Sequence, residues 1–528
     1  MSNPKELIEQ GRVSLGVELG STRIKACLVE SATTKVLGVG SHEWENQLVD
    51  GLWTYSLDSV WSGLAASFSD LQANLENVHG VGVTKLDSLA ISAMMHGYLG
   101  FDSAGELLIP FRTWRNTNTG AAAKELSELF NFNIPLRWSI AHLHQLVIEK
   151  HPHLANLDHV NTLAGYVHWK LSGEKVLGIG DASGMFPIDS KTKTYDQAMV
   201  QKFDQKAKEY GFQKALTSLL PKVLVAGQPA GNLTESGARL LDPKGDLEAG
   251  ALMAPPEGDA GTGMVATNAV APRTGNVSAG TSIFAMIVME KPLSKMHEEI
   301  DVVTTPTGEQ VAMVHCNNGA SEMAAWANMF KRFSDAAGLN LSTDQVYETL
   351  FSEALNGEPD AGGLLAYNYL AGEPIAGVDE GRPLFVRTPG SEFSLANAFR
   401  AQLYGVFGTL SLGMEVLQQE GVALDQMAAH GGIFRTKGVA QRFLAAALET
   451  PVDVSGEASE GGAWGAAVLA AFASSGSESL SDFLNEVVFQ DAAVTRAEPI
   501  ASDVEGYRKF LQAYRKGLQI EKAAVNSI

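Results

Sequence analysis

Residues 14–30 read SLGVELGSTRIKACLVE, and residues 274–290 read TGNVSAGTSIFAMIVME. In each stretch an apolar, strand-like run reaches a short turn of glycine and hydroxyl residues, at 20–22 and at 280–282, and a second apolar run follows. Neither glycine leads directly into a helix pattern, which argues against a P-loop or a dinucleotide-binding turn. We therefore predict two β-hairpins whose tips present backbone amides and hydroxyl groups.

The spacing of the two hairpins bears on domain organisation. About half of the 528-residue chain lies between Gly20 and Gly280, which favours two domains of one architecture that each open with such a hairpin. Chance similarity of two short hairpins is the alternative. Chain length also favours two or three domains. The Pro- and Gly-rich segment 251–263 directly precedes the second hairpin, so we predict domains at 1–262 and 263–528.

Helical patterns fill much of the remaining chain. Apolar residues recur every three or four positions in 121–131 and in 138–150. The alanine-rich run 463–473 predicts a buried helix, since its 11 residues fall short of the ~20 that a membrane span needs. Residues 428–452 read as strand, glycine turn, helix and strand, and 503–522 as a closing helix. This mixture of strands and helices predicts an α/β fold.

Composition and charge exclude several kinds of partner. Hydrophobic residues make up 45% and charged residues 19% of the chain, as in a globular protein. The 39 basic and 60 acidic residues give a net charge of −21, which disfavours nucleic acid and anionic membranes as partners. A nucleotide remains compatible, because local amides and a few cations can hold a triphosphate. Only two cysteines, Cys27 and Cys316, and no apolar signal core predict a cytoplasmic protein without disulfides.

The hairpin tips suit phosphate chemistry. Two tips that face each other could hold a nucleotide triphosphate from both sides, and glycine allows close backbone approach. Glu18, two residues before the first tip, either helps to hold Mg²⁺ or is an ordinary polar residue at a strand end. Lys25, after the tip, either reaches a phosphate or is a solvated surface lysine.

Other polar residues are candidates for the chemistry. Phosphoryl transfer to an alcohol needs a carboxylate that accepts the hydroxyl proton, and Asp259 on a tight loop would meet that need, although Gly-Asp is more commonly a plain turn. The stretches 90–102 and 111–116 place a histidine, a tryptophan and an arginine near strand ends, where they suit a polyhydroxylated substrate but are individually more often structural. No third-ligand spacing accompanies the histidines around the helix 138–150, so no metal site is predicted at His142, His144, His151 and His153.

These stretches resemble motifs of the FGGY family of carbohydrate kinases, in family order from residue 14 to about 470, nearly the whole chain. The first hairpin resembles the phosphate-1 motif, and SAMMHG (92–97) resembles the Met-His-Gly substrate element of xylulokinases. AGYVHWKLSGEKVLGIGDASGM (164–185) is similar to the family stretch that ends in Asp-Ala-Ser-Gly. The other resemblances are TWRN (113–116) to a Trp-Asn-Asp stretch, GDAGTG (258–263) to the loop of the catalytic aspartate, NVSAGTS (276–282) to the phosphate-2 motif, NNGASEMAAW (317–326) to a glycine-rich nucleotide element and HGGIF (430–434) to the adenosine motif.

The resemblance implies an α/β fold of two actin-like (ribonuclease H-like) domains around a central cleft for ATP and sugar. It implies a phosphotransferase that uses ATP and Mg²⁺, takes a small-molecule sugar as its partner and has Asp259 as general base. The implied sugar-binding residues are Met95, His96, Gly97, Trp114 and Asp259, and the implied metal residue is Glu18. The residues implied on the nucleotide are Gly20, Ser21, Thr22, Lys25, Gly280, Thr281, Ser282, Gly319, Gly431 and Gly432.

Departures from the family pattern bear on metal and substrate. Glu18 stands in place of the usual aspartate and is one methylene longer. Ala260 follows the catalytic aspartate, which is more like ribulokinases than xylulokinases, where asparagine is usual. Tyr404 stands where glutamate is common, and the C-terminal signature at 368–383 is matched only loosely. The resemblance to xylulokinases and ribulokinases implies phosphorylation of a primary hydroxyl of a ketopentose, xylulose or ribulose.

Two other classes of protein remain open. A non-catalytic relative would bind sugar or nucleotide as a sensor without releasing ADP, and the departure at Glu18 motivates it. An actin-like ATPase would share the hairpins without a sugar pocket, but MMHG and GDAG in family order argue against it. Whether the protein forms a homodimer is also open.

Overall fold

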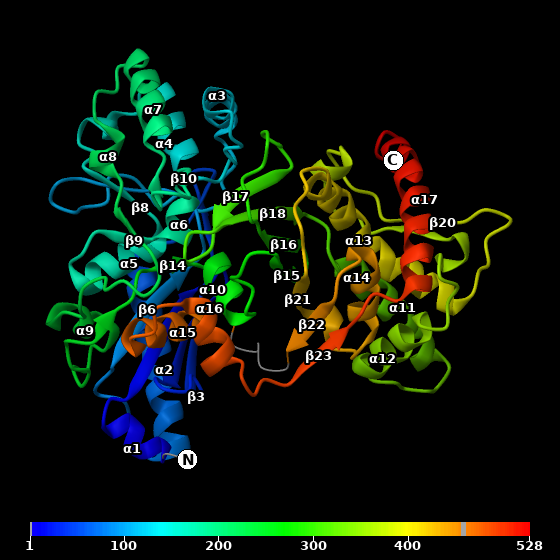
Figure 1. The fold of residues 1–528 in the computed structure, drawn as a ribbon, viewed down its shortest axis with the longest axis horizontal. Helices are drawn as coiled ribbons and strands as arrows, with labels where there is room; N and C mark the ends of the chain where they lie inside the picture. The colour runs from blue at the N-terminus through cyan, green and yellow to red at the C-terminus, as the bar shows by residue number, and fades with distance from the viewer. Residues whose placement is uncertain (1–2, 456–460, 528) are drawn as a thin grey trace.

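Two lobes lie side by side in the computed structural model, which describes residues 3–455 and 461–527 (Figure 1). The sheet of the first lobe has the spatial order β13-β6-β1-β2-β3, and β14 also pairs with β6. β1, β2 and β3 are antiparallel neighbours, whereas β6 runs parallel to β1, and β13 and β14 run parallel to β6. The strands are β1 (Val13–Leu19), β2 (Arg23–Glu30), β3 (Val36–Glu43), β6 (Ser88–Ala93), β13 (Leu252–Met253) and β14 (Glu257–Gly258).

The sheet of the second lobe repeats this arrangement. Its spatial order is β17-β18-β16-β15-β21-β22-β23. β18, β16 and β15 are antiparallel neighbours and β21 and β22 follow in parallel, so β15 stands where β1 stands in the first sheet. The strands are β15 (Thr274–Ala279), β16 (Ile283–Val288), β17 (Ile300–Thr304), β18 (Gln310–Cys316), β21 (Gln426–His430), β22 (Val452–Ser455) and β23 (Val494–Ala497). Both predicted hairpins, β1–β2 and β15–β16, and the repeated architecture are thereby confirmed.

The helices predicted from periodicity are also present. They are α3 (Gly120–Phe130), α4 (Ser139–Ile148), α14 (Val439–Leu448) between β21 and β22, α15 (Gly461–Ser475) and α17 (Ala501–Val525). In the part of the chain that the structure describes, no helix combines the length and the apolar character needed to cross a membrane.

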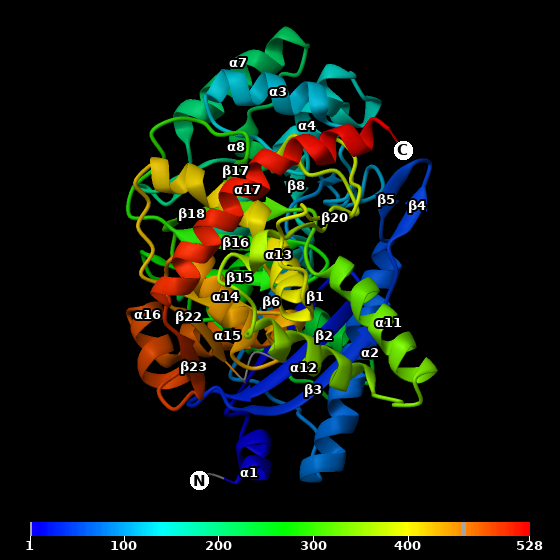
Figure 2. The ribbon, with the colours of Figure 1, turned by 90° about the vertical axis from the view of Figure 1, so that its right-hand side faces the viewer.

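A group of helices extends the first lobe above its sheet (Figure 1). The chain reaches β6 through α2 (Leu57–His79), whose N-terminus is capped by the Ser56 side chain. α2 packs on β3 (Figure 2). Between β6 and β13 the chain then builds this upper group, which includes α3, α4, α5 (Leu163–Ser172) and α6 (Ile179–Ser183). The insertion places side chains above the carboxyl ends of the parallel strands, the usual site of ligands in open α/β sheets.

The chain returns to the first lobe after the second sheet has been built. α15 packs on β1 and β6, and it lies with the first lobe in Figure 1. Gly16 on β1 permits this approach, since a Cβ there would lie 2.1 Å from the carbonyl oxygen of Ala463. The boundary at 262/263 stays a prediction, and α15 shows that a segment from beyond it completes the first lobe.

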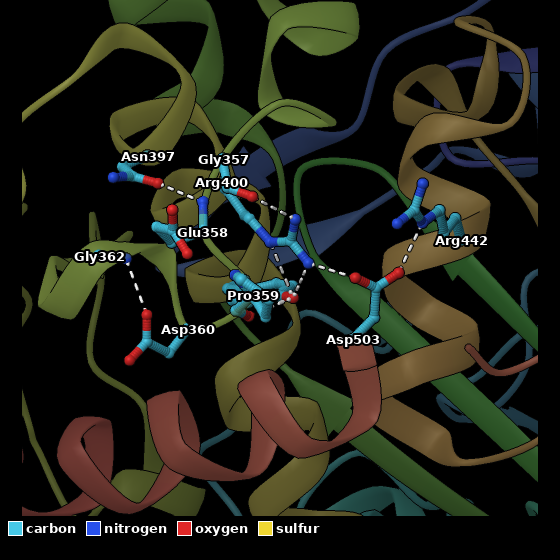
Figure 3. A network of polar contacts seen from close by, with 10 residues as sticks. Gly357, Glu358, Pro359, Asp360, Gly362, Asn397, Arg400, Arg442 and Asp503 are labelled. Carbon is cyan, nitrogen blue, oxygen red and sulfur yellow. Dashed lines mark hydrogen bonds and ion pairs between the residues drawn. The ribbon is translucent and has the colours of Figure 1, made fainter. Parts of the chain in front are cut away.

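A buried ion-pair network joins helices of the second lobe (Figure 3). Arg400 on α13 (Leu395–Gln419) donates from Nη2 to Oδ1 of Asp503 on α17 (2.6 Å), and Arg442 on α14 donates from Nε to Oδ2 (2.5 Å). Arg400 also donates to the Tyr404 hydroxyl, which in turn donates to the carbonyl of Pro359 (3.0 Å). The tyrosine that departs from the family pattern therefore completes a network that holds three helices together.

Candidate active site

The tip of the first hairpin is held through its carbonyl groups. Trp44 donates from Nε1 to the carbonyl of Gly20 (2.7 Å), and the hydroxyl of Tyr55 donates to the carbonyl of Ser21 (2.6 Å). The two aromatic rings stack on each other with centroids 4.1 Å apart. Thr22 is exposed beside them. These contacts hold the turn from the side of its carbonyl groups.

Glu18 and Lys25 face each other across the first hairpin. The antiparallel register of β1 and β2 pairs the two residues directly, so an acidic side chain lies opposite a basic one. Burial raises the pKa of Glu18 to about 7; the Lys25 charge opposes this, and the nearby Asp259 charge adds to it. A Cβ at Gly462 on α15 would lie 2.4 Å from Glu18 Oε1, so a larger residue at this position would displace the carboxyl group of Glu18.

Asp259 is the first residue of α10 (Asp259–Ala266), directly after β14. The expectation of a tight loop is therefore wrong: pairing with β6 carries the strand to Gly258, and the helix starts at once. Its Oδ1 accepts the backbone N–H groups of Met95 (3.2 Å) and Ala260 (3.0 Å). The residue as a whole is solvent-exposed, but protein surrounds its carboxyl group. The resulting loss of hydration raises the pKa of the Asp259 carboxyl above its usual value.

Two buried carboxyl groups behind Asp259 were missed from the sequence. Glu257 accepts the N–H of Gly180 at Oε1 (3.2 Å) and of Asp181 at Oε2 (2.9 Å). Asp181 accepts the Thr162 hydroxyl at Oδ2 (2.7 Å), while its Oδ1 has no partner within the described chain. Burial raises the pKa of Glu257 to about 8 and that of Asp181 to about 7. Asp181 lies inside the quoted Gly-Asp-Ala-Ser-Gly stretch and Glu257 beside Gly-Asp, but neither position by itself signals burial.

The Met-His-Gly element follows β6 and lies against Asp259. Met95 is buried and reaches Asp259 through its N–H, as described above. His96 has a φ of +70°, an uncommon left-handed conformation for a residue with a side chain, and its ring donates from Nδ1 to the carbonyl of Gly184 (3.2 Å). Burial lowers the pKa of His96 well below its usual range, so the ring is neutral at pH 7. Gly97 donates its N–H to the carbonyl of Arg137 (3.1 Å).

Polar atoms near this element lack partners in the described residues. They are Nε1 of Trp138, Oγ of Ser139, both ring nitrogens of His142, and Nε and Nη1 of Arg112. Trp138 stacks on His96 with centroids 6.2 Å apart, and the others lie on the first turns of α4 or beside Tyr98. Buried polar groups normally find a partner, so this region suits a ligand rich in hydroxyl groups, or water. Trp114 is 37% exposed.

The second hairpin borders a cavity of about 850 Å³. Gly319 donates its N–H to the carbonyl of Thr281 (2.7 Å), and Gly431, at φ +122°, lies so close to Ala279 that a Cβ would be 2.0 Å from its carbonyl oxygen. The predicted glycines therefore meet around one hairpin, with Ser282 in its turn. The cavity is lined from α11 (Ser321–Ala336), α12 (Thr343–Ala354), the hairpin and the turn after β21: Ala279, Gly280, Thr281, Ala320, Ser321, Met323, Asp344, Tyr347, Glu348, Phe351, Ser352, Gly432, Ile433, Arg435, Thr436 and Lys437.

The geometry agrees with comparisons to known proteins. Residues 13–243 match the N-terminal domain, and residues 275–474 the C-terminal domain, of the FGGY family of carbohydrate kinases. The chain belongs to this family. It is therefore a phosphotransferase that acts on an alcohol group of a sugar, and sugar kinases of the family use ATP.

The relatives of this kinase span nearly its whole length. The xylulose kinase of Haemophilus influenzae is 21% identical over 511 residues, 95% of this chain and 98% of the relative, and that of Escherichia coli is 24% identical over 96% and 99%. Among solved structures, a gluconate kinase from Lactobacillus acidophilus (TM-score 0.78, 18% identity) and a xyloylose kinase from Brucella ovis (TM-score 0.75, 20% identity) each cover 96% of this chain, with 98% of their own. These likenesses confirm the two-domain actin-like fold class.

The kinase carries its predicted residues on two separate surfaces. The residues that line the large cavity all come from the second lobe, whereas Glu18, Lys25, Met95, His96 and Asp259 belong to the first. Among the described residues, no group of three or more His, Cys, Asp or Glu side chains is arranged to hold a metal ion. Magnesium in kinases is usually held by one or two carboxylates together with substrate phosphates, so Glu18 beside the charge of Asp259 is a suitable donor set.

Proposed function

We propose that this kinase transfers the γ-phosphoryl group of ATP to a primary hydroxyl of a ketopentose, xylulose or ribulose. The ketopentose is supported by the two xylulose kinases that match nearly the whole chain. The unpartnered polar atoms around Trp138 and His142 support a substrate rich in hydroxyl groups. A cytoplasmic location and the absence of a nucleic-acid partner remain expectations from composition.

The position of Asp259 is the single observation that carries the proposal. The residue is solvent-exposed, and its carboxyl group is oriented by two N–H donors and lies beside Met95 of the substrate element. We assign it the role of general base, which accepts the hydroxyl proton as the sugar oxygen attacks the γ-phosphorus. Because Met95 belongs to the element that would bind the sugar, the base and the acceptor hydroxyl would be positioned by the same backbone. Neutral His96 would hydrogen-bond the sugar without repelling Mg²⁺.

The nucleotide would lie in the second lobe with its phosphates toward the first. The cavity at Gly280, Thr281 and Gly432 suits the nucleoside, and the N-terminus of α11 suits a phosphate. Ser21, Thr22 and Lys25 would reach the phosphates when the lobes approach each other, which also excludes water. Magnesium, held through Glu18, would neutralise phosphate charge during transfer.

Replacement of the base tests this function. We expect Asp259→Ala to lower sugar-dependent ADP release roughly 10²–10⁴-fold, since that is the usual contribution of a positioned base. Nucleotide affinity should be nearly unchanged, because the nucleotide cavity lies in the other lobe. Asp158→Ala, in an exposed pair with Lys175, is the matched control. Near-normal sugar phosphorylation by Asp259→Ala would show that the base is assigned wrongly.

A sugar panel tests the substrate. ATP and Mg²⁺ with ketopentoses, ketohexoses, sugar acids and polyols should give the highest kcat/KM with a ketopentose. Preference for a sugar acid would replace the ketopentose while keeping the reaction. Binding of a sugar without ADP release would identify a sensor instead.

A further inference from the structure

The loop 305–309 joins β17 to β18 at the edge of the second sheet, and it is attached to the first lobe. β17 lies beside α6 in Figure 1. Thr304, the last residue of β17, donates its N–H to the Ser183 hydroxyl (3.0 Å) and its hydroxyl to the carbonyl of Ile179 (3.0 Å). Both acceptors lie on α6 of the first lobe. The hairpin of the second sheet therefore reaches the first lobe at the point where its loop begins.

The loop is held in one conformation by its own side chains. The hydroxyl of Thr305 accepts the N–H groups of Thr307 (3.3 Å) and Glu309 (3.1 Å), and it donates to Oε2 of Glu309 (2.8 Å). Gly308 has a φ of +94°, and a Cβ there would lie 2.9 Å from the Ile179 side chain on α6. Glycine suits both this backbone conformation and this close approach. A loop held in this way can support the elements that it contacts.

Pro306 of this loop contacts the helix that begins with Asp259. Pro306 is buried, and its carbonyl accepts the N–H of Ala226 of the first lobe (2.8 Å). A Cβ at Gly261 on α10 would lie 3.3 Å from Cγ and 3.7 Å from Cδ of the Pro306 ring. The ring thus lies against the first turn of α10, two residues after Asp259. Because glycine carries no side chain there, the ring and the helix backbone come close together.

We propose that Pro306 is a positioning residue through which the second lobe sets the place of the proposed base. The start of α10 follows β14, which pairing with β6 holds on one side, and the Pro306 ring supports the first turn from the other lobe. Close packing leaves little room for this turn to shift while the ring is in place. A shift of the turn would move Asp259 relative to the acceptor hydroxyl, and small misplacements of reacting groups cost large factors in rate. This inference rests on the proposed role of Asp259.

The other end of β17 offers a contact between the lobes for comparison. Asn133, in the loop between α3 and α4, donates from Nδ2 to the carbonyl of Ile300 (3.1 Å) and to Oδ1 of Asp301 (3.0 Å). Arg137 forms an ion pair with Oδ2 of the same Asp301. These contacts hold the same strand through a different element of the first lobe. If the Pro306 contact mattered only because it joins the lobes, removal of the Asn133 side chain would affect turnover in the same way.

The test is a double-mutant cycle across the contact in the full-length enzyme. It measures kcat and KM with ATP, Mg²⁺ and the sugar of the panel that gives the highest kcat/KM. Gly261→Ala adds a methyl group that crowds the Pro306 ring, and Pro306→Ala removes the ring atoms that support the turn. Each should lower kcat roughly 10-fold, since a displacement of about 1 Å can cost about 100-fold. The KM for ATP should be nearly unchanged, because the nucleotide cavity does not include either residue.

The double variant Gly261→Ala/Pro306→Ala should recover most of the lost kcat, because the new methyl group takes the space that the ring carbon left. Asn133→Ala should leave kcat nearly unchanged. Melting temperatures separate positioning from stability: Gly261→Ala should not lower the melting temperature, since alanine favours a helix more than glycine does.

Unchanged kcat in both single variants, additive losses in the double variant, or an equal loss in Asn133→Ala would overturn the inference. Asp259→Asn separates this failure from failure of the proposed function. If Asp259→Asn remains active, the base is assigned wrongly. If Asp259→Asn is inactive while the Gly261 and Pro306 variants turn over normally, only the positioning contact is wrong.

Discussion

Asp503 of the second lobe and the pair Asp181 and Glu257 of the first lobe are fully buried acids of two different kinds. Asp503 of the second lobe lies between two arginines, which approach its carboxylate from two sides (Figure 3). Although burial raises the pKa of Asp503, hydrogen bonds from Arg442 and Arg400 outweigh it and leave the pKa below its usual value. Asp181 and Glu257 of the first lobe have no ion-pair partner among the described residues, and burial raises the pKa of both.

The difference separates structural acids from acids that surround chemistry. A buried carboxylate paired with two arginines is neutralised by them and links their helices. A buried carboxyl group without a cation tends to hold a proton. Asp181 and Glu257 lie behind Asp259, and the charge of Asp259 adds to the raised pKa of Asp181. Unpaired buried acids of this kind concentrate at functional sites, and Asp181 and Glu257 lie beside the proposed base.

Removing the paired acid should have the largest effect on stability. We expect Asp503→Ala to lower the free energy of unfolding by about 3–5 kcal/mol, because two arginines, one of them fully buried, lose their counter-charge. Denaturant unfolding at pH 7 measures this. Glu449→Ala, in an exposed pair with Arg508, is the control and should cost about 1 kcal/mol or less. Equal losses of stability in the two variants would contradict the difference expected between buried and exposed ion pairs.

Replacement of Glu18 tests whether its carboxyl group helps to hold Mg²⁺. We expect Glu18→Gln to raise the Mg²⁺ concentration for half-maximal activity roughly 10- to 100-fold, the range seen when a metal site loses a supporting group. Glu18→Asp keeps the carboxylate and should lie much closer to the parent. Activity is measured against free Mg²⁺ at saturating ATP and sugar. An unchanged Mg²⁺ requirement in Glu18→Gln would exclude Glu18 from the metal site.

The pH dependence of stability tests whether a buried acid without a cation holds a proton. The pKa of Glu257 is about 8 in the folded protein against 4.5 ordinarily, so between these values the folded state binds more protons than the unfolded state. Stability should therefore fall as pH rises through this window, by at most about 1.4 kcal/mol per pH unit for one proton. Glu257→Gln removes this proton, so its melting temperature should fall less between pH 6 and pH 8. A parallel decline would show that Glu257 is already ionised at pH 6.

The smallest effect is expected from the loss of one hydrogen bond between uncharged groups. Trp44→Phe removes the hydrogen bond to the carbonyl of Gly20 at the first hairpin, which is worth about 1 kcal/mol. We expect a KM for ATP raised less than about tenfold, with kcat changed less. Trp61→Phe is the control, since the Trp61 side chain donates to Tyr166 away from the hairpin. A larger effect in the control would mean that hairpin rigidity is not limiting.

Much of this architecture was readable from local pattern. Strand-turn-strand signals at 14–30 and 274–290 predicted both hairpins, because glycine turns and alternating apolar runs act over a few residues. Counting from the turn even pairs Glu18 with Lys25, since the register of a hairpin follows from its turn. The order of motifs predicted the family, which two family domains confirm.

Other parts of the site depend on contacts that no local pattern contains. Asp259 was expected on a tight loop, but pairing of β14 with β6 places it at the start of a helix. The partners of the acid cluster come from distant segments, such as Gly180 for Glu257. Arg137 acquires its place from Asp301, which lies in the other lobe.

Local sequence was thus sufficient for the elements, the duplicated architecture and the reaction class, because turns, periodicity and ordered motifs involve neighbouring residues. Packing between distant segments decided which acids are neutralised and which hold protons. The reason is electrostatic: the free energy of a charge depends on burial and on nearby counter-charges, and both are set only when segments such as α6, β14 and β17 meet in the fold.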